Sequence, residues 1–148
     1  MKNDRVNFMG ASPMSTTLLV AEDDIFIRAM IAEFLRDSGF DVVEAGSAQE
    51  ALDVFESGAD IDLLFSDVKM PGAMDGCDLA KHVRENWPDT KVILTSGYSD
   101  ALLKADDSIL GAVLKKPYRP LSVLAAVLAA VDSELAVPHP TSYLKPLA

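Results

Sequence analysis

Three carboxylates stand directly after largely apolar runs that have the length of buried strands. Glu22 and Asp23 follow residues 18–21, and Asp67 follows residues 61–66. If these runs are neighbouring parallel strands, their carboxyl ends meet at one edge of a sheet and the carboxylates converge. Like charges about 4 Å apart repel by roughly 4 kcal/mol at an effective dielectric of 20, so such a cluster needs a cation. An all-oxygen site suits Mg²⁺, which takes one or two carboxylates and keeps several waters.

A hydroxyl and an ammonium group end the next two apolar runs. Thr95 closes the run that begins at residue 92, and Lys116 follows residues 112–115 and precedes Pro117. Either residue alone is ordinary, because most lysines are solvated and many strands end in threonine. Their common position after successive strands predicts one oxygen-rich site with a cation opposite.

A simpler interpretation of the acidic pair is also open. Asp23 and Asp24 would then only cap the first helix, as an acidic pair before a helix more often does, since carboxylates accept hydrogen bonds from the free N–H groups of a helix start. Asp67 favours a functional site, because an aspartate after a very apolar strand is costly without a partner. No Cys–His cluster competes for zinc, and the single cysteine, Cys77, cannot form an internal disulfide.

The segments that must position these residues alternate between strand and helix patterns. Apolar runs predict strands at residues 17–21, 41–45, 62–66, 91–95 and 112–115. Helical spacing and capping signals predict helices at about 27–38, 47–57, 77–86, 101–105 and 120–135. Buried strands alternating with helices predict an α/β fold with a parallel sheet covered on both faces. Five strands suit the flavodoxin-like doubly wound sheet of order 2-1-3-4-5, with helices on both faces.

Length and composition bound the remaining possibilities. The 148 residues suit one domain at 16–136, between a flexible N-terminal leader at 1–15 and a flexible, proline-containing tail at 137–148. Acidic residues outnumber basic ones by 23 to 13, which argues against nucleic-acid and anionic-membrane partners. The apolar stretch Val123–Val131 is too short to span a bilayer, and residues 1–14 lack a signal-peptide core. A cytoplasmic location is therefore expected.

The chain resembles the receiver domain of two-component response regulators over residues 16–135. The segments that carry the resemblance are Val20-Ala21-Glu22-Asp23-Asp24, Ser66-Asp67-Val68-Lys69-Met70-Pro71-Gly72, Asp75-Gly76, Leu94-Thr95-Ser96-Gly97 and Lys115-Lys116-Pro117-Tyr118. The resemblance implies a phosphoacceptor that receives its phosphoryl group from a sensor histidine kinase or a histidine phosphotransfer protein. A downstream protein would then recognise the phosphorylated form.

The resemblance also implies a role for each residue of the site. Asp67 is the expected phosphoacceptor, forming an aspartyl phosphate with the help of Mg²⁺. The expected metal ligands are Glu22 through water, Asp23, Asp67 and the backbone carbonyl of Lys69. The expected phosphoryl-binding and switch residues are Thr95, Ser96 and Lys116. The Lys116–Pro117 peptide bond is expected to be cis.

Some positions depart from the family pattern. Many receivers carry an aromatic residue three positions before the site lysine, and here that position is Val113. Tyr98 is the alternative switch aromatic, although an ordinary surface tyrosine fits it as well. The segment 100–110 is a poor helix and is expected to be the mobile element. The loop 70–76 is slightly longer than in the simplest receivers, which predicts altered loop geometry with unaltered chemistry.

The last predicted helix is unusually apolar. Leu124, Val127, Leu128 and Val131 have core spacing, and surface around Val123 and Ala130 is expected to be spare. Two interpretations stand equal: a partner or homodimer contact through this helix, or coverage by the C-terminal tail.

Competing functions are a receiver-like interaction module that is never phosphorylated, and an aspartyl-phosphate hydrolase of the haloacid dehalogenase type. The hydrolase pattern needs an acid two residues past its nucleophile, where this chain has Lys69. The complete set of site residues argues against the unphosphorylated module. The chain is also similar to receivers of hybrid histidine kinases, although Met1 and the two tails favour a free-standing protein.

Overall fold

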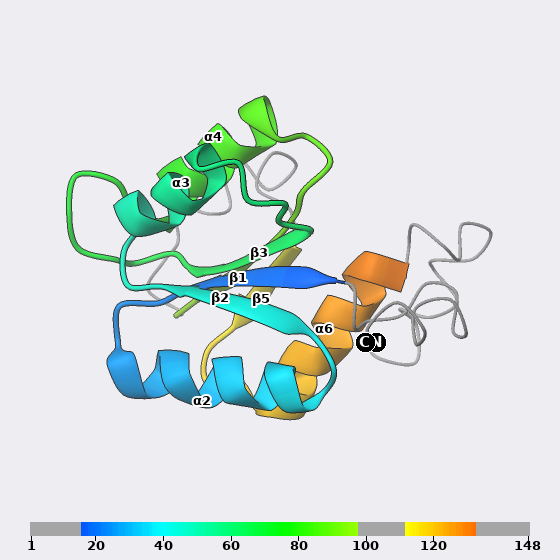
Figure 1. Ribbon diagram of the computed structural model, residues 1–148. Coiled ribbons are helices and arrows are strands. Elements are labelled where there is room, and N and C mark those ends of the chain that lie inside the picture. The colour runs from blue at the N-terminus through cyan, green and yellow to red at the C-terminus, as the bar shows by residue number, and fades with distance from the viewer. Residues whose placement is uncertain (1–15, 98–111, 133–148) are drawn as a thin grey trace.

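The fold is a five-stranded parallel sheet with helices on both faces (Figure 1). The structure, a computed structural model, describes residues 16–97 and 112–132. The strands are β1 (Thr17–Ala21), β2 (Asp41–Ala45), β3 (Leu63–Asp67), β4 (Lys91–Ser96) and β5 (Ala112–Lys115), in the order β2-β1-β3-β4-β5. The described helices are α2 (Ile25–Asp37), α3 (Ala48–Glu56), α4 (Gly76–Asn86) and α6 (Pro120–Asp132). The predicted flavodoxin-like fold and strand order are therefore confirmed.

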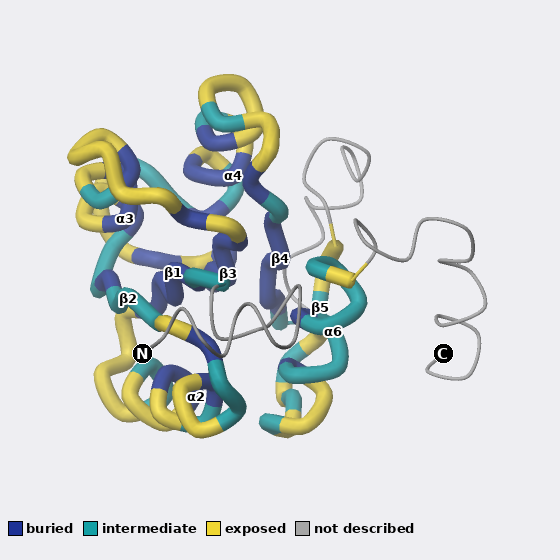
Figure 2. The backbone as a smooth tube through the Cα atoms, turned by 45° about the vertical axis from the view of Figure 1, so that its right-hand side comes forward, coloured by how far each residue is buried: buried dark blue, intermediate teal, exposed yellow. Residues whose placement is uncertain are grey.

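The helices form two layers around the sheet. Helices α3 and α4 cover one face, and α2 and α6 cover the other (Figures 1 and 2). The central strands β1, β3 and β4 are buried along nearly their whole length, whereas β2, at an edge, is only half-buried (Figure 2). This burial explains why the central strands read as continuous apolar runs in the sequence.

Local hydrogen bonds set where the helices begin and end. Asp24 caps α2, and Gly39, with φ of 106°, follows its end, a position that favours glycine. Ser47 caps α3 by accepting a hydrogen bond from the N–H of Glu50, whose carboxylate in turn accepts from the N–H of Gly46. Ser47 and Glu50 together therefore satisfy two free N–H groups at the start of α3.

The capping of α4 was not predicted. Asp75 and Asp78 form a reciprocal capping box, so α4 begins at Gly76, one residue earlier than expected. Asp78 accepts from the N–H of Asp75, and Asp75 accepts from the N–H of Asp78. This box ends the loop that follows β3 at a fixed point beside the sheet edge.

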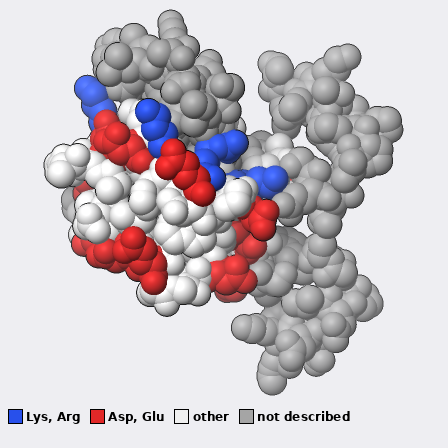
Figure 3. Space-filling model, turned by 90° about the horizontal axis from the view of Figure 1, so that it is seen from above, with Lys and Arg blue, Asp and Glu red and all other residues white. Residues whose placement is uncertain are grey.

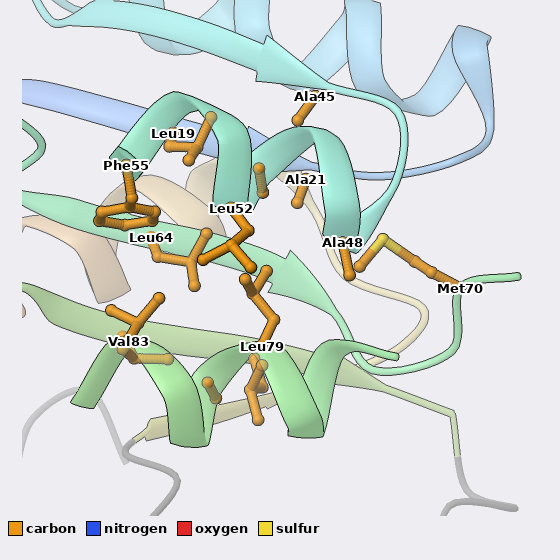
Figure 4. Close-up of a cluster of buried hydrophobic side chains, with 14 of the residues drawn as sticks. Leu19, Ala21, Ala45, Ala48, Leu52, Phe55, Leu64, Met70, Leu79 and Val83 are labelled. Atoms are coloured by element: carbon orange, nitrogen blue, oxygen red, sulfur yellow. The ribbon is translucent and has the colours of Figure 1, made fainter. Parts of the chain in front are cut away.

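The core on the α3 and α4 face consists of small and large apolar side chains that interlock. Figure 4 shows Leu52 and Phe55 of α3 and Leu79 and Val83 of α4 gathered around Leu64 of β3. The Met70 side chain extends back toward Ala48 at the start of α3 (Figure 4). Since Met70 is 7% exposed, it anchors the loop after β3 to the core.

The other core lies under α2 and α6 and corrects one prediction. Val123 and Val127 are fully buried in it, while Leu124, Leu128 and Val131 are partly buried against it. The expectation of spare surface around Val123 is therefore wrong, because α6 turns that side chain directly onto the sheet. The exposed apolar residue of this helix is Leu121, which is 69% exposed.

The surface carries both signs of charge. On the face viewed in Figure 3, the Lys and Arg side chains lie interspersed with Asp and Glu rather than in one basic field. Among the described helices, none is both long and apolar enough to cross a membrane. The predictions for residues 1–15, 98–111 and 133–148, including Tyr98, the segment 100–110, the leader and the tail, lie outside the described residues.

Candidate functional site

The sheet register brings the predicted site residues to one edge. Ala21 pairs with Ser66, so Glu22 and Asp23 emerge beside Asp67, the last residue of β3. Asp67 itself pairs with Thr95 of β4. Because all the strands are parallel, their carboxyl ends lie at one edge of the sheet, and these residues lie at that edge. The strand order reverses there between β1 and β3, which is where ligands bind in open α/β sheets.

The three carboxylates converge. One carboxylate oxygen from each of Glu22, Asp23 and Asp67 lies within 4.8 Å of the others. Glu22 and Asp67 are buried, at 5% and 6% exposure, while Asp23 faces solvent. Three clustered oxygen donors with an opening to water match the chemistry of a hard divalent cation such as Mg²⁺.

Helix capping does not account for this cluster. Asp24 is the cap of α2, since its Oδ1 accepts from the N–H groups of Phe26 and Ile27. Glu22 supports that turn, because its Oε2 accepts from the N–H of Asp24 at 3.0 Å. Asp23 is thus a separate residue from the cap.

Lys116 closes the site on the side of β5. Its Nζ atom lies 2.9 Å from Oδ2 of Asp67. The backbone N–H of Lys116 donates to the carbonyl of Ser96 at 2.8 Å, so the lysine is aligned by the end of β4. The Lys116–Pro117 peptide bond is cis. The lysine therefore stands where a cation can balance charge on Asp67 and on a group attached to it.

Thr95 and Ser96 are both buried at the end of β4, at 1% and 3% exposure. The Thr95 hydroxyl lies 3.5 Å from Oδ1 of Asp67, the outer limit of a hydrogen bond. Its backbone carbonyl accepts from the N–H of Val68 at 2.9 Å, which binds the β3 end to β4. Lys116 and Thr95 thus approach different oxygens of the same carboxylate.

The electrostatics of the site are those of clustered charges partly removed from water. Burial raises the pKa of Glu22 above its ordinary value, and the neighbouring carboxylates Asp67 and Asp23 add to the increase. Burial alone would lower the pKa of Lys116, but its hydrogen bond to Asp67 and the surrounding carboxylates raise it overall. Lys116 therefore stays protonated, and the cluster favours a further cation.

The loop after β3 is built around a close approach of two backbones. Gly76 donates its N–H to the carbonyl of Val68 at 2.8 Å. A Cβ atom at Gly76 would stand 2.0 Å from the carbonyl oxygen of Asp67, so only glycine fits. Lys69 lies in this loop with an exposed side chain. The expected role of its carbonyl as a metal ligand stays a prediction.

The sequence analysis assigned no role to two residues near the site, Tyr118 and Arg28. Tyr118 packs edge-on against Phe65, with 6.1 Å between the ring centroids. Burial raises the pKa of Tyr118 to about 12, and the nearby carboxylates Glu22 and Asp67 contribute to the increase. Arg28 donates to the carbonyl of Glu22 at 2.9 Å. The Arg28 contact has no local sequence signal, because its acidic partner Glu44 is sixteen residues away. Val113, at the usual aromatic position, is 40% exposed on β5.

The family follows from comparison with known proteins. A family model for the response regulator receiver domain matches residues 18–128. The chain therefore belongs to this family, and the predicted resemblance is confirmed. The match favours the receiver over the haloacid dehalogenase alternative. Receivers are a family of signalling domains.

Curated relatives include both kinases and regulators. The chain is 40% identical to the sensor kinase CckA of Brucella abortus over 87 residues, which are 58% of this chain and 9% of CckA. It is 37% identical to the transcriptional regulatory protein PdtaR of Mycobacterium tuberculosis over 117 residues, 78% of this chain and 56% of PdtaR. The chain thus matches only part of the length of each of these relatives.

Solved structures have the same architecture. A response regulator receiver protein from Sinorhizobium medicae superposes with a TM-score of 0.74 and 25% identity, covering 80% of this chain and 95% of that one. Response regulator TrrA from Thermotoga maritima, in complex with Mg²⁺ and BeF, has a TM-score of 0.67 and 26% identity over 76% of this chain and 96% of TrrA. The fold of this chain is therefore that of a receiver domain.

Proposed function

We propose that this chain is a phosphorylation-dependent signalling switch, with Asp67 as phosphoacceptor. The observation that carries the proposal is the convergence of Glu22, Asp23 and Asp67 within 4.8 Å, with Lys116 at 2.9 Å from Asp67. The phosphodonor is a phosphohistidine on a sensor histidine kinase or a histidine phosphotransfer protein. The kinship with the sensor kinase CckA and the regulator PdtaR supports such a partner.

The cation of the site is Mg²⁺, and the oxygen-only donor set supports this choice. Asp23 and Asp67 would hold it directly, Glu22 through water, and the Lys69 carbonyl would complete the protein ligands. When bound, Mg²⁺ offsets negative charge on the attacking and phosphoryl oxygens.

The residues of the chain perform the transfer by positioning and charge. A carboxylate oxygen of Asp67 attacks phosphorus, the O–P bond forms, and the P–N bond to the histidine breaks, releasing the imidazole. Lys116 stabilises charge on a phosphoryl oxygen, and its raised pKa keeps it protonated for this purpose. The Thr95 hydroxyl, 3.5 Å from Asp67, turns to the phosphoryl group once it is present, with Ser96 beside it at the strand end.

The donor protein must bring its histidine to this sheet edge, and exposed apolar side chains flank the edge on one side. Ile25, Phe26 and Met30 of α2 are 59%, 82% and 49% exposed. Ile25 and Phe26 follow Asp24 directly, and Met30 lies one turn further along α2, so a partner that covers them lies beside the acidic cluster. Large exposed apolar side chains grouped in this way mark protein contacts.

The domain spans residues 16–136, acts in the cytoplasm, and catalyses only its own phosphorylation and dephosphorylation. The downstream protein recognises the phosphorylated face, without nucleic-acid or membrane contact by this domain. Receivers of hybrid kinases and free-standing regulators share this chemistry.

The test is intact-mass measurement after incubation with Mg²⁺ and acetyl phosphate. Wild type should gain one phosphoryl group, and EDTA should abolish the gain. Asp67→Asn should gain nothing, whereas the control Asp41→Asn, which changes an exposed aspartate at the start of β2, should behave as wild type. No gain in wild type, repeated with phosphoramidate, would favour the interaction module that is never phosphorylated.

A further inference from the structure

Arg28 of α2 joins three parts of the molecule at the rear of the acidic cluster. Its Nη1 atom donates to the backbone carbonyl of Glu22 at 2.9 Å, and its Nε atom lies 3.3 Å from Oε1 of Glu44 on β2. Its side chain is 19% exposed, so water competes little for these contacts. A single guanidinium therefore connects α2, the end of β2 and the loop that bears the carboxylates.

The carbonyl that Arg28 holds belongs to the peptide unit between Glu22 and Asp23. A peptide unit is planar, so fixing its carbonyl also fixes the direction in which Asp23 leaves the plane. The other side of Glu22 is held as well, since its N–H donates to the carbonyl of Ala45 at 3.0 Å. Two of the three clustered carboxylates thus depend on backbone held from β2 and α2.

Gly46 packs against the guanidinium of Arg28. A Cβ atom at Gly46 would stand 3.1 Å from Nη1 of Arg28, closer than most such contacts. Arg36 binds the other oxygen of the same Glu44 carboxylate, with its Nη2 atom 3.1 Å from Oε2. The orientation of Arg28 is therefore set by packing on one side and by an anchored carboxylate on the other.

We infer that Arg28 is a positioning residue for the cation site: it sets the Glu22–Asp23 peptide so that the two acidic side chains meet Asp67 in a geometry ready for Mg²⁺. This inference rests on the proposed function, because it assigns a determinant of cation affinity to the same site. Arg28 acts through the backbone and touches neither cation nor phosphoryl group.

The chain contains a matched control for this idea. Arg36 lies on the same helix, pairs with the same Glu44 carboxylate, and also donates to a backbone carbonyl, that of Val42 at 3.0 Å. It differs from Arg28 in which carbonyl it holds, because Val42 is the second residue of β2, at the opposite end of that strand from the acidic loop. Arg36→Lys therefore repeats the chemical change of Arg28→Lys without the contact in question.

The experiment measures the Mg²⁺ dissociation constant of the full chain by isothermal titration calorimetry. Lysine keeps the positive charge but cannot hold Glu44 and the Glu22 carbonyl at once, so Arg28→Lys should weaken Mg²⁺ binding about tenfold, the usual cost of losing a group that orients a metal ligand. Arg36→Lys should leave the dissociation constant unchanged. Gly46→Ala, which crowds the guanidinium, should weaken Mg²⁺ binding in the same direction and by less.

Thermal unfolding without Mg²⁺ separates positioning from general damage. Similar melting temperatures for Arg28→Lys and Arg36→Lys, together with different Mg²⁺ affinities, would establish the role of Arg28. Equal Mg²⁺ affinities in wild type and both lysine variants would overturn it, as would a loss of affinity common to both variants. If wild type itself binds no Mg²⁺, the proposed function fails, and the inference about Arg28 falls with it.

Discussion

The ammonium group of Lys116 and the carboxylate of Asp67 form a direct ion pair, 2.9 Å apart, across strands β3 and β5, which are separated by β4. The pair is possible because Lys116 follows the end of β5 and reaches over the end of β4 toward β3. Asp67 is 6% exposed, so the lysine is a main source of compensating charge for the metal-free site.

Lys116→Gln should slow phosphorylation of Asp67 strongly. Removing one preorganised charge from a developing anionic centre costs on the order of a hundredfold in rate. The measurement is the rate of mass gain with acetyl phosphate at saturating Mg²⁺. Lys115→Gln, which removes the neighbouring exposed lysine of β5, is the control and should leave the rate unchanged. Equal rates in the two variants would remove Lys116 from the mechanism.

Gly76→Ala should destabilise the fold and distort the site. Its Cβ would meet the Asp67 carbonyl oxygen at 2.0 Å and the Val68 Cα at 2.8 Å, so the two backbones must separate. Overpacking against backbone costs about 3 kcal/mol in free energy of unfolding. Urea denaturation measures this loss.

The control for that prediction is Gly97→Ala, where a Cβ would have no neighbour within 4 Å. It should change the free energy of unfolding little. If both alanine variants were equally stable, the contact between Gly76 and Asp67 would carry no constraint.

The sequence predicts the elements that depend on local pattern well. The buried strands read as apolar runs, and the predicted bounds of β1, β2 and β5 agree with the structure. The convergence of Glu22, Asp23 and Asp67 could also be predicted, since it follows from parallel strands and their order.

Contacts that do not follow from the order of the strands could not be predicted from the sequence. The Arg28–Glu44 pair and the approach of Gly76 to Asp67 depend on how the strands and loops meet in space. The side of α6 that packs on the sheet could not be predicted from the sequence either. Its apolar residues surround much of the helix, so periodicity could not show that Val123 turns inward and Leu121 outward.

Tyr118 should ionise far above the ordinary range of tyrosine. Burial first, and then the carboxylates Glu22 and Asp67, raise its pKa from 10.0 to about 12 because they disfavour the phenolate. A group whose pKa is raised on folding contributes stability that is fully present below the unfolded pKa. That contribution should be lost as the pH rises from about 10 through 12.

The measurement is a spectrophotometric titration of tyrosine ionisation in wild type and Tyr118→Phe. The difference between the two curves should contain one phenol that titrates near pH 12, and wild-type stability should fall more steeply above pH 10 than that of the variant. A difference curve centred at pH 10 would show that Tyr118 is not held against the site.

Phe26→Ser should slow phosphotransfer from a protein donor while leaving the intrinsic chemistry intact. Phe26 is 82% exposed on the first turn of α2, next to the acidic loop, so its loss costs the folded domain little packing. Truncating an aromatic anchor at a protein interface weakens binding by about 2 kcal/mol or more. The rate of transfer from the phosphorylated kinase that serves wild type, measured at a receiver concentration below saturation, should fall correspondingly. Mass gain with acetyl phosphate, which needs no docking surface, is the control and should match wild type. A loss of both rates would place Phe26 in the site itself, and a loss of neither would move the donor contact away from α2.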